Sequence, residues 1–248
     1  MTVPEQARVF EDVAAQYERG RPDFPDELGA WLISNGLLGP NRVALDLGAG
    51  TGKFTRQLVN TGAHVIAVEP IGTMRAVLER VLPGVESLEG AAEAIPVDAD
   101  SVDAVAAATA FHWFANRAAL SEIVRVLHPN GELLIVNTDY ERSTPLQHRL
   151  VELRGLAQRT LTTTAGDSNW RAIIDGDDRF DFHGETFFRH QIFLDLPSLF
   201  DRLRSNSAIA ALTEVEREAM VEELSGLVDD PEHIDVSQRA RVLRYGKR

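Results

Sequence analysis

An acid followed by three alternating glycines is the segment of this chain best suited to hold a ligand. Residues 46–52 read Asp-Leu-Gly-Ala-Gly-Thr-Gly and continue a short apolar run. Glycine has no side chain and tolerates positive φ, so such a loop can turn sharply and pass close to a bound molecule. A strand-to-helix turn without a ligand needs only one or two glycines. Three in alternation after an acid therefore predict a cofactor loop.

The spacing of these glycines separates the kinds of cofactor. A dinucleotide fingerprint is Gly-x-Gly-x-x-Gly; counted from Gly48, its third glycine falls at position 53, which is Lys53. The third glycine stands one residue earlier, at Gly52. The phosphate-loop pattern Gly-x-x-x-x-Gly-Lys-[Ser/Thr] also fails, because Gly48 lies only four residues before Gly52. The loop therefore departs from the usual nicotinamide, flavin and nucleoside-triphosphate motifs.

A second acid stands where a ribose would be bound. Glu69 follows the apolar run 64–68, precedes Pro70 and lies seventeen residues after Gly52. A carboxylate at the end of a second strand can accept hydrogen bonds from both ribose hydroxyls. Alone, Glu69 is equally well a solvated acid; beside the glycine loop it favours an adenosine ligand without deciding which one.

Two later segments carry further candidate groups. Residues 90–96 read Gly-Ala-Ala-Glu-Ala-Ile-Pro, and Glu93 is their ionisable side chain, although a plain surface loop is a nearly equal interpretation. Residues 109–114 read Thr-Ala-Phe-His-Trp-Phe and gather three aromatic rings around His112. His112 can act as a general base at neutral pH or only orient an acceptor, and the neighbouring rings can be core.

Short apolar runs and amphipathic segments alternate from residue 42 onward. Strands are expected at 43–47, 64–68, 102–107 and 132–136, with a weaker one near Val85. Helices are expected at 53–60, 72–82 and 117–127. This alternation is typical of parallel strands buried on both faces. The glycine loop then lies at the carboxyl edge of the sheet, where open α/β sheets bind ligands.

The flanking regions predict more helices around the sheet. Before it, helices are expected at 5–17 and 26–35, with an extended loop at 18–25 because this stretch contains two prolines and a glycine. After it, helices are expected at 144–164, 196–212 and 214–227, a short apolar patch at 169–174, one or two strands at 182–194 and a closing strand at 236–246.

Composition indicates a soluble, cytoplasmic protein. The 248 residues are 44% apolar and 25% charged, and the net charge of −13 argues against nucleic acid or a membrane as partner. There is no cysteine, which excludes thiolate catalysis and fits a reducing compartment. No secretory signal or run of about 18 apolar residues is visible. Histidines at 183, 190 and 233 lack metal-ligand spacing, so no metal is expected. A monomer or homodimer is expected.

The set of motifs resembles a known family of enzymes. Asp-x-Gly-x-Gly-x-Gly is similar to the first motif of class I methyltransferases that use S-adenosylmethionine (SAM). With the Tyr17–Pro25 segment, the His112 run and residues 125–135, the chain resembles the Methyltransferase-11 type, in particular its trans-aconitate-methyltransferase-like branch. The likeness covers residues 5–138 and is loose beyond residue 140.

This resemblance implies a Rossmann-like α/β fold. The expected sheet has seven mostly parallel strands with helices on both faces. The whole chain, 1–248, is expected to be one domain, with an N-terminal helical lid (1–36), a SAM-binding core (41–138) and C-terminal substrate-side helices and closing strands (139–248).

The resemblance also implies methyl transfer from SAM to a small-molecule acceptor, without a metal. His112 and Arg21 would be catalytic, and Arg19 or Arg21 would hold a carboxylate, since the arginine fork meets a carboxylate bidentately. A carboxylate acceptor needs no base, whereas a hydroxyl or an acidic carbon would use His112. The implied cofactor-binding residues are Tyr17, Arg21, Asp46, Gly48, Ala49, Gly50, Gly52, Glu69, Pro70, Ala92, Glu93 and Thr109. An NAD(P)-dependent oxidoreductase and a non-catalytic SAM-binding protein stay open as alternatives.

Overall fold

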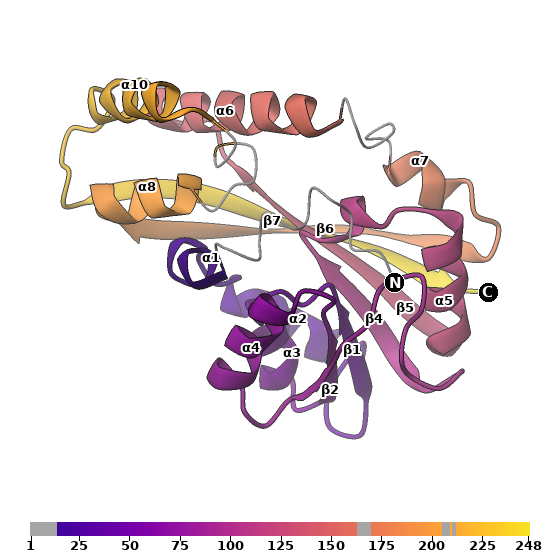
Figure 1. Ribbon diagram of the computed structural model, residues 1–248. Coiled ribbons are helices and arrows are strands. Elements are labelled where there is room, and N and C mark those ends of the chain that lie inside the picture. Colours follow the sequence, from indigo (N-terminus) through magenta and orange to yellow (C-terminus); the bar gives the residue numbers. More distant parts are fainter. Residues whose placement is uncertain (1–13, 163–169, 205–208, 210–211) are drawn as a thin grey trace.

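A seven-stranded sheet forms the centre of the computed structural model, which describes residues 14–162, 170–204, 209 and 212–248 (Figure 1). The strand order is β3-β2-β1-β4-β5-β7-β6. Strands β1 to β5 pair in parallel, and β7 runs antiparallel to both β5 and β6. The strands are β1 Val43–Leu47, β2 His64–Val68, β3 Glu86–Leu88, β4 Val102–Ala108, β5 Leu127–Tyr140, β6 Phe180–Leu194 and β7 Ile234–Lys247. The expected α/β fold with a mostly parallel sheet is confirmed.

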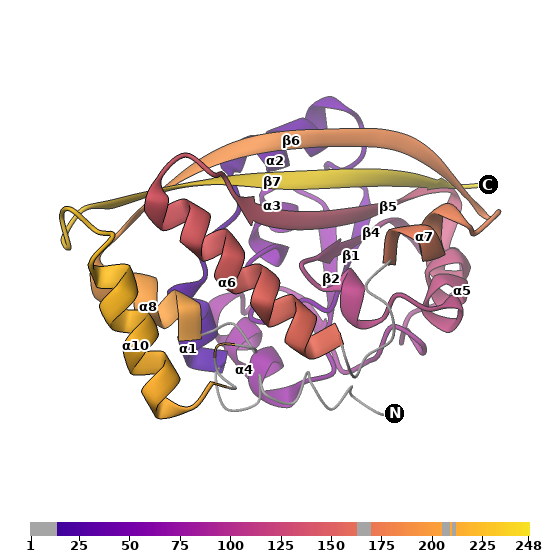
Figure 2. The same cartoon turned by 90° about the horizontal axis from the view of Figure 1, so that it is seen from above.

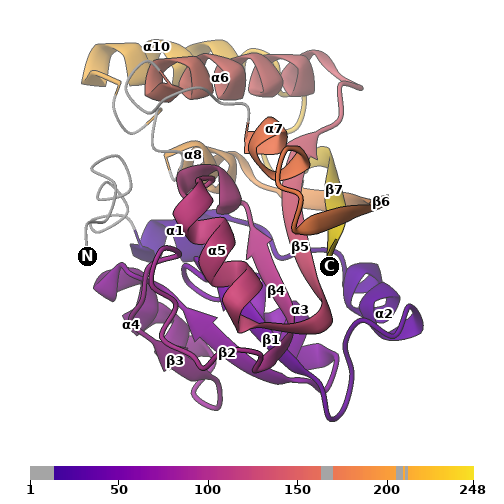
Figure 3. The same ribbon diagram turned by 90° about the vertical axis from the view of Figure 1, so that its right-hand side faces the viewer.

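Helices cover both faces of this sheet. The helices are α1 Ala14–Gly20, α2 Asp26–Ser34, α3 Thr55–Asn60, α4 Gly72–Val81, α5 Arg117–Val126, α6 Pro145–Thr162, α7 Trp170–Asp175, α8 Leu196–Arg204 and α10 Glu214–Ser225. Figure 3 shows α2 and α5 on opposite sides of the strands. Within the described residues, no helix is long and apolar enough to cross a membrane.

The core follows from the double burial of the central strands. Leu45 of β1 packs in a cluster with α5, and its neighbour Ala44 packs in the cluster on the other face with α2 and α3. Alternate residues of a strand point to opposite faces, so a strand covered on both faces must be apolar throughout. This explains why β1, β2 and β4 are near-continuous apolar runs.

A helical layer stands on the carboxyl edge of the sheet. Helices α6 and α10 lie side by side above α8 (Figures 1 and 2). Leu150 of α6, Leu199 of α8 and Leu224 of α10 are at most 1% exposed and share one apolar cluster with the start of β7. The layer is therefore attached to the sheet through the long outer strands.

Most expected elements are confirmed, and the differences arise from long-range contacts. The helix expected to end at Tyr17 continues through Gly20, so the predicted loop start was wrong; residues 5–13 of that prediction lie outside the described residues. The strand expected at 132–136 spans Leu127–Tyr140, because β7 pairs with it as far as Tyr140. The apolar patch at 169–174 forms helix α7 from residue 170 onward.

Two further boundaries differ in the C-terminal part. Residues 180–194 form one strand with a bulge between Phe182 and Gly184, where one or two strands were expected. Helix α8 ends at Arg204, whereas the prediction ran to residue 212; residues 205–208 and 210–211 lie outside the described part. A capping box between Thr213 and Glu216 begins α10 at Glu214, as the sequence pattern predicted.

Candidate cofactor site

All three glycines of the loop after β1 have left-handed backbone conformations. Their φ angles are 73° at Gly48, 59° at Gly50 and 89° at Gly52. A Cβ at Gly48 would lie 2.9 Å from the Cβ of Ala110, and at Gly52 3.0 Å from Leu82 Cδ1. At Gly50 a Cβ would meet no atom within 4 Å. The loop therefore packs on the protein through two glycines and presents open space at the third.

Glu69, at the end of β2, holds this open glycine in place. Its Oε2 accepts a hydrogen bond from the Gly50 N–H at 2.8 Å, and its Oε1 accepts one from the Ile71 N–H at 2.8 Å. The side chain is 4% exposed. Burial raises the pKa of Glu69, while the two N–H groups and Arg75 act against the rise. Each carboxylate oxygen keeps acceptor capacity for a ligand hydroxyl; ribose binding by Glu69 stays a prediction.

Asp46 lies behind the loop. Its carboxyl is 1% exposed, and its Oδ2 accepts a hydrogen bond from Thr55 Oγ1 at 2.6 Å. Burial raises its pKa to about 7; the Thr55 hydroxyl opposes this rise and the neighbouring Glu69 adds to it. The sequence-based hypothesis gave Asp46 a contact with the cofactor, direct or through water. In the structure Oδ2 is bonded to the first residue of α3 and Oδ1 has no hydrogen-bond partner among the described residues, so a contact of Asp46 with the cofactor stays a prediction.

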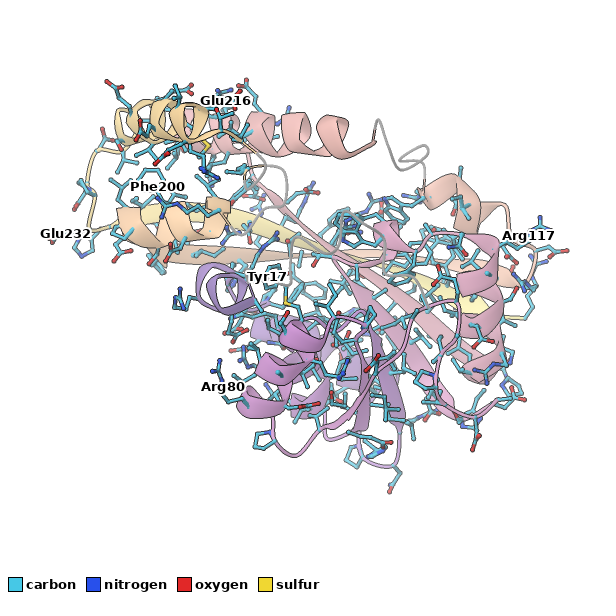
Figure 4. All side chains as sticks on the ribbon, viewed as in Figure 1. Tyr17, Arg80, Arg117, Phe200, Glu216 and Glu232 are labelled. Carbon is cyan, nitrogen blue, oxygen red and sulfur yellow. The ribbon has the colours of Figure 1, made fainter. Side chains whose placement is uncertain are left out.

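The N-terminal segment carries Arg21, which forms no ion pair with any of the described residues. The Arg21 guanidinium lies 5.0 Å from the centre of the Tyr17 ring, and its buried Nε has no hydrogen-bond partner in the described residues. Figure 4 shows Tyr17 where α1 passes between the sheet core and the helical layer. Arg19 is exposed. Of the two candidate arginines, Arg21 is therefore the partly buried one.

Four charged residues around Arg21 join the N-terminal segment to the glycine loop. Glu18 and Asp23 both contact Lys53 and Arg56, at N–O distances from 2.6 to 3.4 Å. Sequence reasoning missed this cluster. The two cations, spaced three residues apart immediately after Gly52, were a weak signal because that spacing places them on one side of a helical turn.

The loop after β3 is tied to helix α5. Ala91 and Ala94 form an isolated bridge, and Ala92 is buried in the core. Glu93 accepts a hydrogen bond from Asn116 Nδ2 at 2.8 Å, and Asn116 Oδ1 caps α5 by accepting from the Ala119 N–H. The Glu93 carboxylate is therefore engaged in holding this loop.

The His112 segment begins with a strained residue at the end of β4. Thr109 has φ of 51°, rare for a β-branched residue, and its N–H donates to the Val136 carbonyl of β5 at 2.7 Å. Phe111–Trp113 then form a 3₁₀ turn. The Phe111 ring packs in the core, and the exposed His112 ring lies 4.9 Å from Trp113. The turn thus places His112 at the carboxyl edge of the sheet.

The residues present fit a SAM-like group. Four buried polar atoms of the N-terminal segment, β1 and the glycine loop have no hydrogen-bond partner in the described chain: Glu18 Oε2, Arg21 Nε, Asp46 Oδ1 and Thr51 Oγ1. Two buried acids, and an arginine that pairs with no acid among the described residues, match a ligand that carries hydroxyls, a positive charge and a carboxylate. Nowhere in the described ranges do three His, Asp or Glu side chains gather as metal ligands.

A hollow of about 330 Å³ lies at the opposite edge of the sheet. It is lined by the ends of α3 and α4 and by the start of β2. Its ionisable group, His64, contacts Glu86 at 3.4 Å. Because it opens at the amino end of β2, it is separate from the glycine loop.

The strand order, the glycine loop and Glu69 define a Rossmann-like methyltransferase fold, and comparisons with known proteins agree. Residues 45–135 match the family described as "Methyltransferase domain". A methyltransferase-like protein of Schizosaccharomyces pombe is 33% identical over 223 residues, which are 88% of this chain and 84% of that protein. The chain belongs to this methyltransferase family.

Other relatives match over shorter stretches. An uncharacterised methyltransferase of Mycobacterium tuberculosis is 48% identical over 134 residues, 54% of each chain, so the match spans about half of that protein. The structure of a candidate type II methyltransferase from Anaeromyxobacter dehalogenans has a TM-score of 0.70 at 24% identity, covering 92% of this chain and 97% of that one. This structure shows the shared fold. Family membership favours a methyltransferase over the oxidoreductase alternative.

Proposed function

We propose that this protein transfers the methyl group of SAM to a small-molecule acceptor and leaves S-adenosylhomocysteine. The observation that carries the proposal is the left-handed glycine loop, fastened to Glu69 and open at Gly50. The strand order and the methyltransferase family support it. A loop of this geometry allows a ligand to approach the backbone where any side chain would stand in its way.

Different residues around the loop would bind different parts of the cofactor. Glu69 would accept hydrogen bonds from the ribose hydroxyls, because one of its oxygens already bonds to the glycine loop at Gly50 and each oxygen can accept a further hydrogen bond. Arg21 would pair with the cofactor carboxylate, or with an acid group of the acceptor. The loop at residues 90–94 would adjoin the adenine ring through its backbone.

Catalysis in this proposal depends mainly on positioning. When bound, SAM supplies a methyl group on a positively charged sulfur, which is already an activated leaving group. The chain must therefore hold the acceptor in line at about 3–3.5 Å and exclude water. For a carboxylate acceptor, Arg21 would orient the acid and no base would be needed. For a hydroxyl or an acidic carbon, a ring nitrogen of His112 would take the proton.

We further propose a small carboxylic acid as acceptor, as in the trans-aconitate-methyltransferase-like branch. The support is the Tyr17–Pro25 segment, in which Arg21 has no carboxylate partner among the described residues, together with the His112 run. We propose that the protein acts in the cytoplasm as a monomer or homodimer, because its acidic, cysteine-free composition suits that compartment.

Calorimetric titration of the pure protein with SAM tests the donor. We expect saturable binding in the micromolar range typical of enzyme substrates, and no binding at millimolar SAM would refute the proposal. The fluorescence of added NADH should not change in the presence of the protein. An increase in this fluorescence would favour the oxidoreductase alternative. Turnover on a panel of carboxylate, hydroxyl and carbon acceptors identifies the chemistry. Unchanged turnover of His112→Ala would remove His112 from the role of base.

A further inference from the structure

We propose that Glu18, Asp23, Lys53 and Arg56 form an ionic clasp that fastens the N-terminal segment carrying Arg21 to the glycine loop and slows the release of the bound cofactor. The inference rests on the proposed function, because it assumes that SAM occupies this loop. The four residues would act as positioning residues. They need not touch the reacting atoms.

The clasp has two acids on one segment and two cations on another. Arg56 donates from Nη2 to Glu18 Oε1 at 2.6 Å and from Nη1 to Asp23 Oδ1 at 2.9 Å. Lys53 Nζ lies 3.4 Å from the same Glu18 oxygen and 3.2 Å from the same Asp23 oxygen. Each cation thus bridges both acids. Because the acids lie on either side of Arg21 in sequence, the clasp holds both ends of the segment that carries it.

The inner part of the clasp is largely shielded from water. The side chains of Lys53 and Glu18 are 14% and 16% exposed, while Asp23 is 57% exposed. Burial lowers the pKa of Arg56, but its bonds to Glu18 and Asp23 outweigh this and raise the pKa overall. Isolated surface pairs contribute only about 0–1 kcal/mol. A partly buried network with shared partners is held more firmly, because solvent screens it less.

The cations of the clasp are continuous with the cofactor loop. Lys53 directly follows Gly52, and the Arg56 N–H donates to the Gly52 carbonyl at 3.1 Å. Thr55, between them, holds Asp46. A displacement of Lys53 or Arg56 would therefore also displace the backbone of the glycine loop.

The other side of α1 rests on the helical layer. A Cβ at Gly20 would lie 2.8 Å from the backbone of Arg202 in α8, and Arg202 Nε donates to the Tyr140 hydroxyl at 2.6 Å. The N-terminal segment thus has one attachment by close packing and one by ion pairs. The ionic attachment can open without creating a cavity, so we assign to it the opening that lets the cofactor leave.

The experiment measures S-adenosylhomocysteine release by stopped flow and its affinity by calorimetry. The variants are Glu18→Gln, Arg56→Gln and the double variant, and the control is Arg42→Gln. Arg42, which directly precedes β1, makes an ion pair of the same 2.6 Å length with Asp103 of β4. This pair lies at the amino end of β1, away from the glycine loop. Melting temperatures and circular dichroism test whether each variant is folded.

Release should become about tenfold faster in each clasp variant, with affinity about tenfold weaker, which corresponds to about 1.4 kcal/mol. The effects of the two substitutions should be less than additive in the double variant, because each single variant removes the Glu18–Arg56 pair together with one further pair. Raising NaCl from 0.05 to 1 M should speed release from the wild type, since the Debye length falls from above 10 Å to about 3 Å. Release from the double variant should respond less, and Arg42→Gln should behave as wild type.

The outcomes separate the two proposals. Wild-type protein that binds neither SAM nor S-adenosylhomocysteine refutes the proposed function, and the clasp with it. Wild-type binding with unchanged release in folded Glu18→Gln and Arg56→Gln refutes the clasp alone. Equal acceleration in Arg42→Gln would also overturn it, because the effect would then follow from any lost ion pair.

Discussion

At the scale of single residues, the three loop glycines serve two different purposes. Gly48 and Gly52 combine a left-handed φ with close neighbours, whereas Gly50 combines it with open space. The first two are therefore needed for packing. Gly50 leaves room for the proposed cofactor. Substitution of each glycine can therefore separate the effect on folding from the effect on cofactor binding.

Replacing Gly50 by alanine should impair cofactor binding more than folding. Its Cβ meets no protein atom, so the cost is the left-handed strain of about 1–2 kcal/mol. The methyl would stand in the proposed cofactor space, and SAM affinity should fall at least tenfold. Gly48→Ala adds a contact of 2.9 Å with Ala110 and should lose about 1–3 kcal/mol more of unfolding free energy. Urea unfolding and calorimetric titration measure both, and an unaffected affinity in Gly50→Ala would contradict the placement.

The buried carboxyl of Asp46 should make stability depend on pH. Its pKa rises from 3.8 in the unfolded chain to about 7 in the fold, so the native state binds the extra proton between these values. The contribution is full below pH 4 and is lost as pH rises towards 7. At about 1.4 kcal/mol per pKa unit, the wild type should lose about 2–3 kcal/mol between pH 5 and pH 8 relative to Asp46→Asn. Urea unfolding at both pH values tests this, and parallel losses would contradict it.

At the scale of elements, contacts between distant segments decide what the sequence pattern does not. Apolar periodicity was enough to predict β1, β2, β4, α4 and α5, because the pattern of buried residues in each is complete within the element itself. The extension of β5 beyond Val136 depends on pairing with β7, about a hundred residues later. Likewise α1 continues to Gly20 because that residue packs on α8.

The candidate site divides in the same way. The glycine loop and Glu69 were predictable, because the residues that identify them are only a few positions apart in the sequence. Glu18 and Arg56 are 38 residues apart, and their pairing appears only when α1 and α3 are placed together. Asp46 was recognised as important, but its burial behind the loop depends on Thr55 and could not be read from the motif.

Packing of α1 on α8 gives a prediction at this scale. A methyl at Gly20 would press on the backbone of Asp201 and Arg202 at 2.8 Å, so α1 must shift. Gly20→Ala should lower the free energy of unfolding by about 1–3 kcal/mol and speed S-adenosylhomocysteine release. Gly72→Ala is the matched control, because its Cβ meets nothing and it begins α4. Urea unfolding and stopped flow should show no loss for Gly72→Ala, and an equal loss in both would contradict the close contact.

At the scale of the whole molecule, the outer strands join the two layers. Strands β5 and β7 begin or end in the helical layer and pair within the core sheet, from Glu132↔Gly246 to Tyr140↔Gln238. Strand β6 follows β7 over its length. The helical layer buries leucines against the start of β7 and has no separate sheet among the described residues. Core and layer therefore share the same strands, which favours the expected single domain.

This sharing predicts one unfolding transition that responds as a unit to the cofactor. Calorimetry should give a single peak with equal calorimetric and van't Hoff enthalpies. A ligand that binds only the native state at a hundred times its Kd adds about 2.7 kcal/mol. For a chain of this size each kcal/mol moves Tm by about 2–4 °C, so saturating S-adenosylhomocysteine should raise the whole peak by about 5–10 °C. A second peak that stays in place as ligand is added would show that the C-terminal layer unfolds independently. The loop would then bind its cofactor without help from the helices above it.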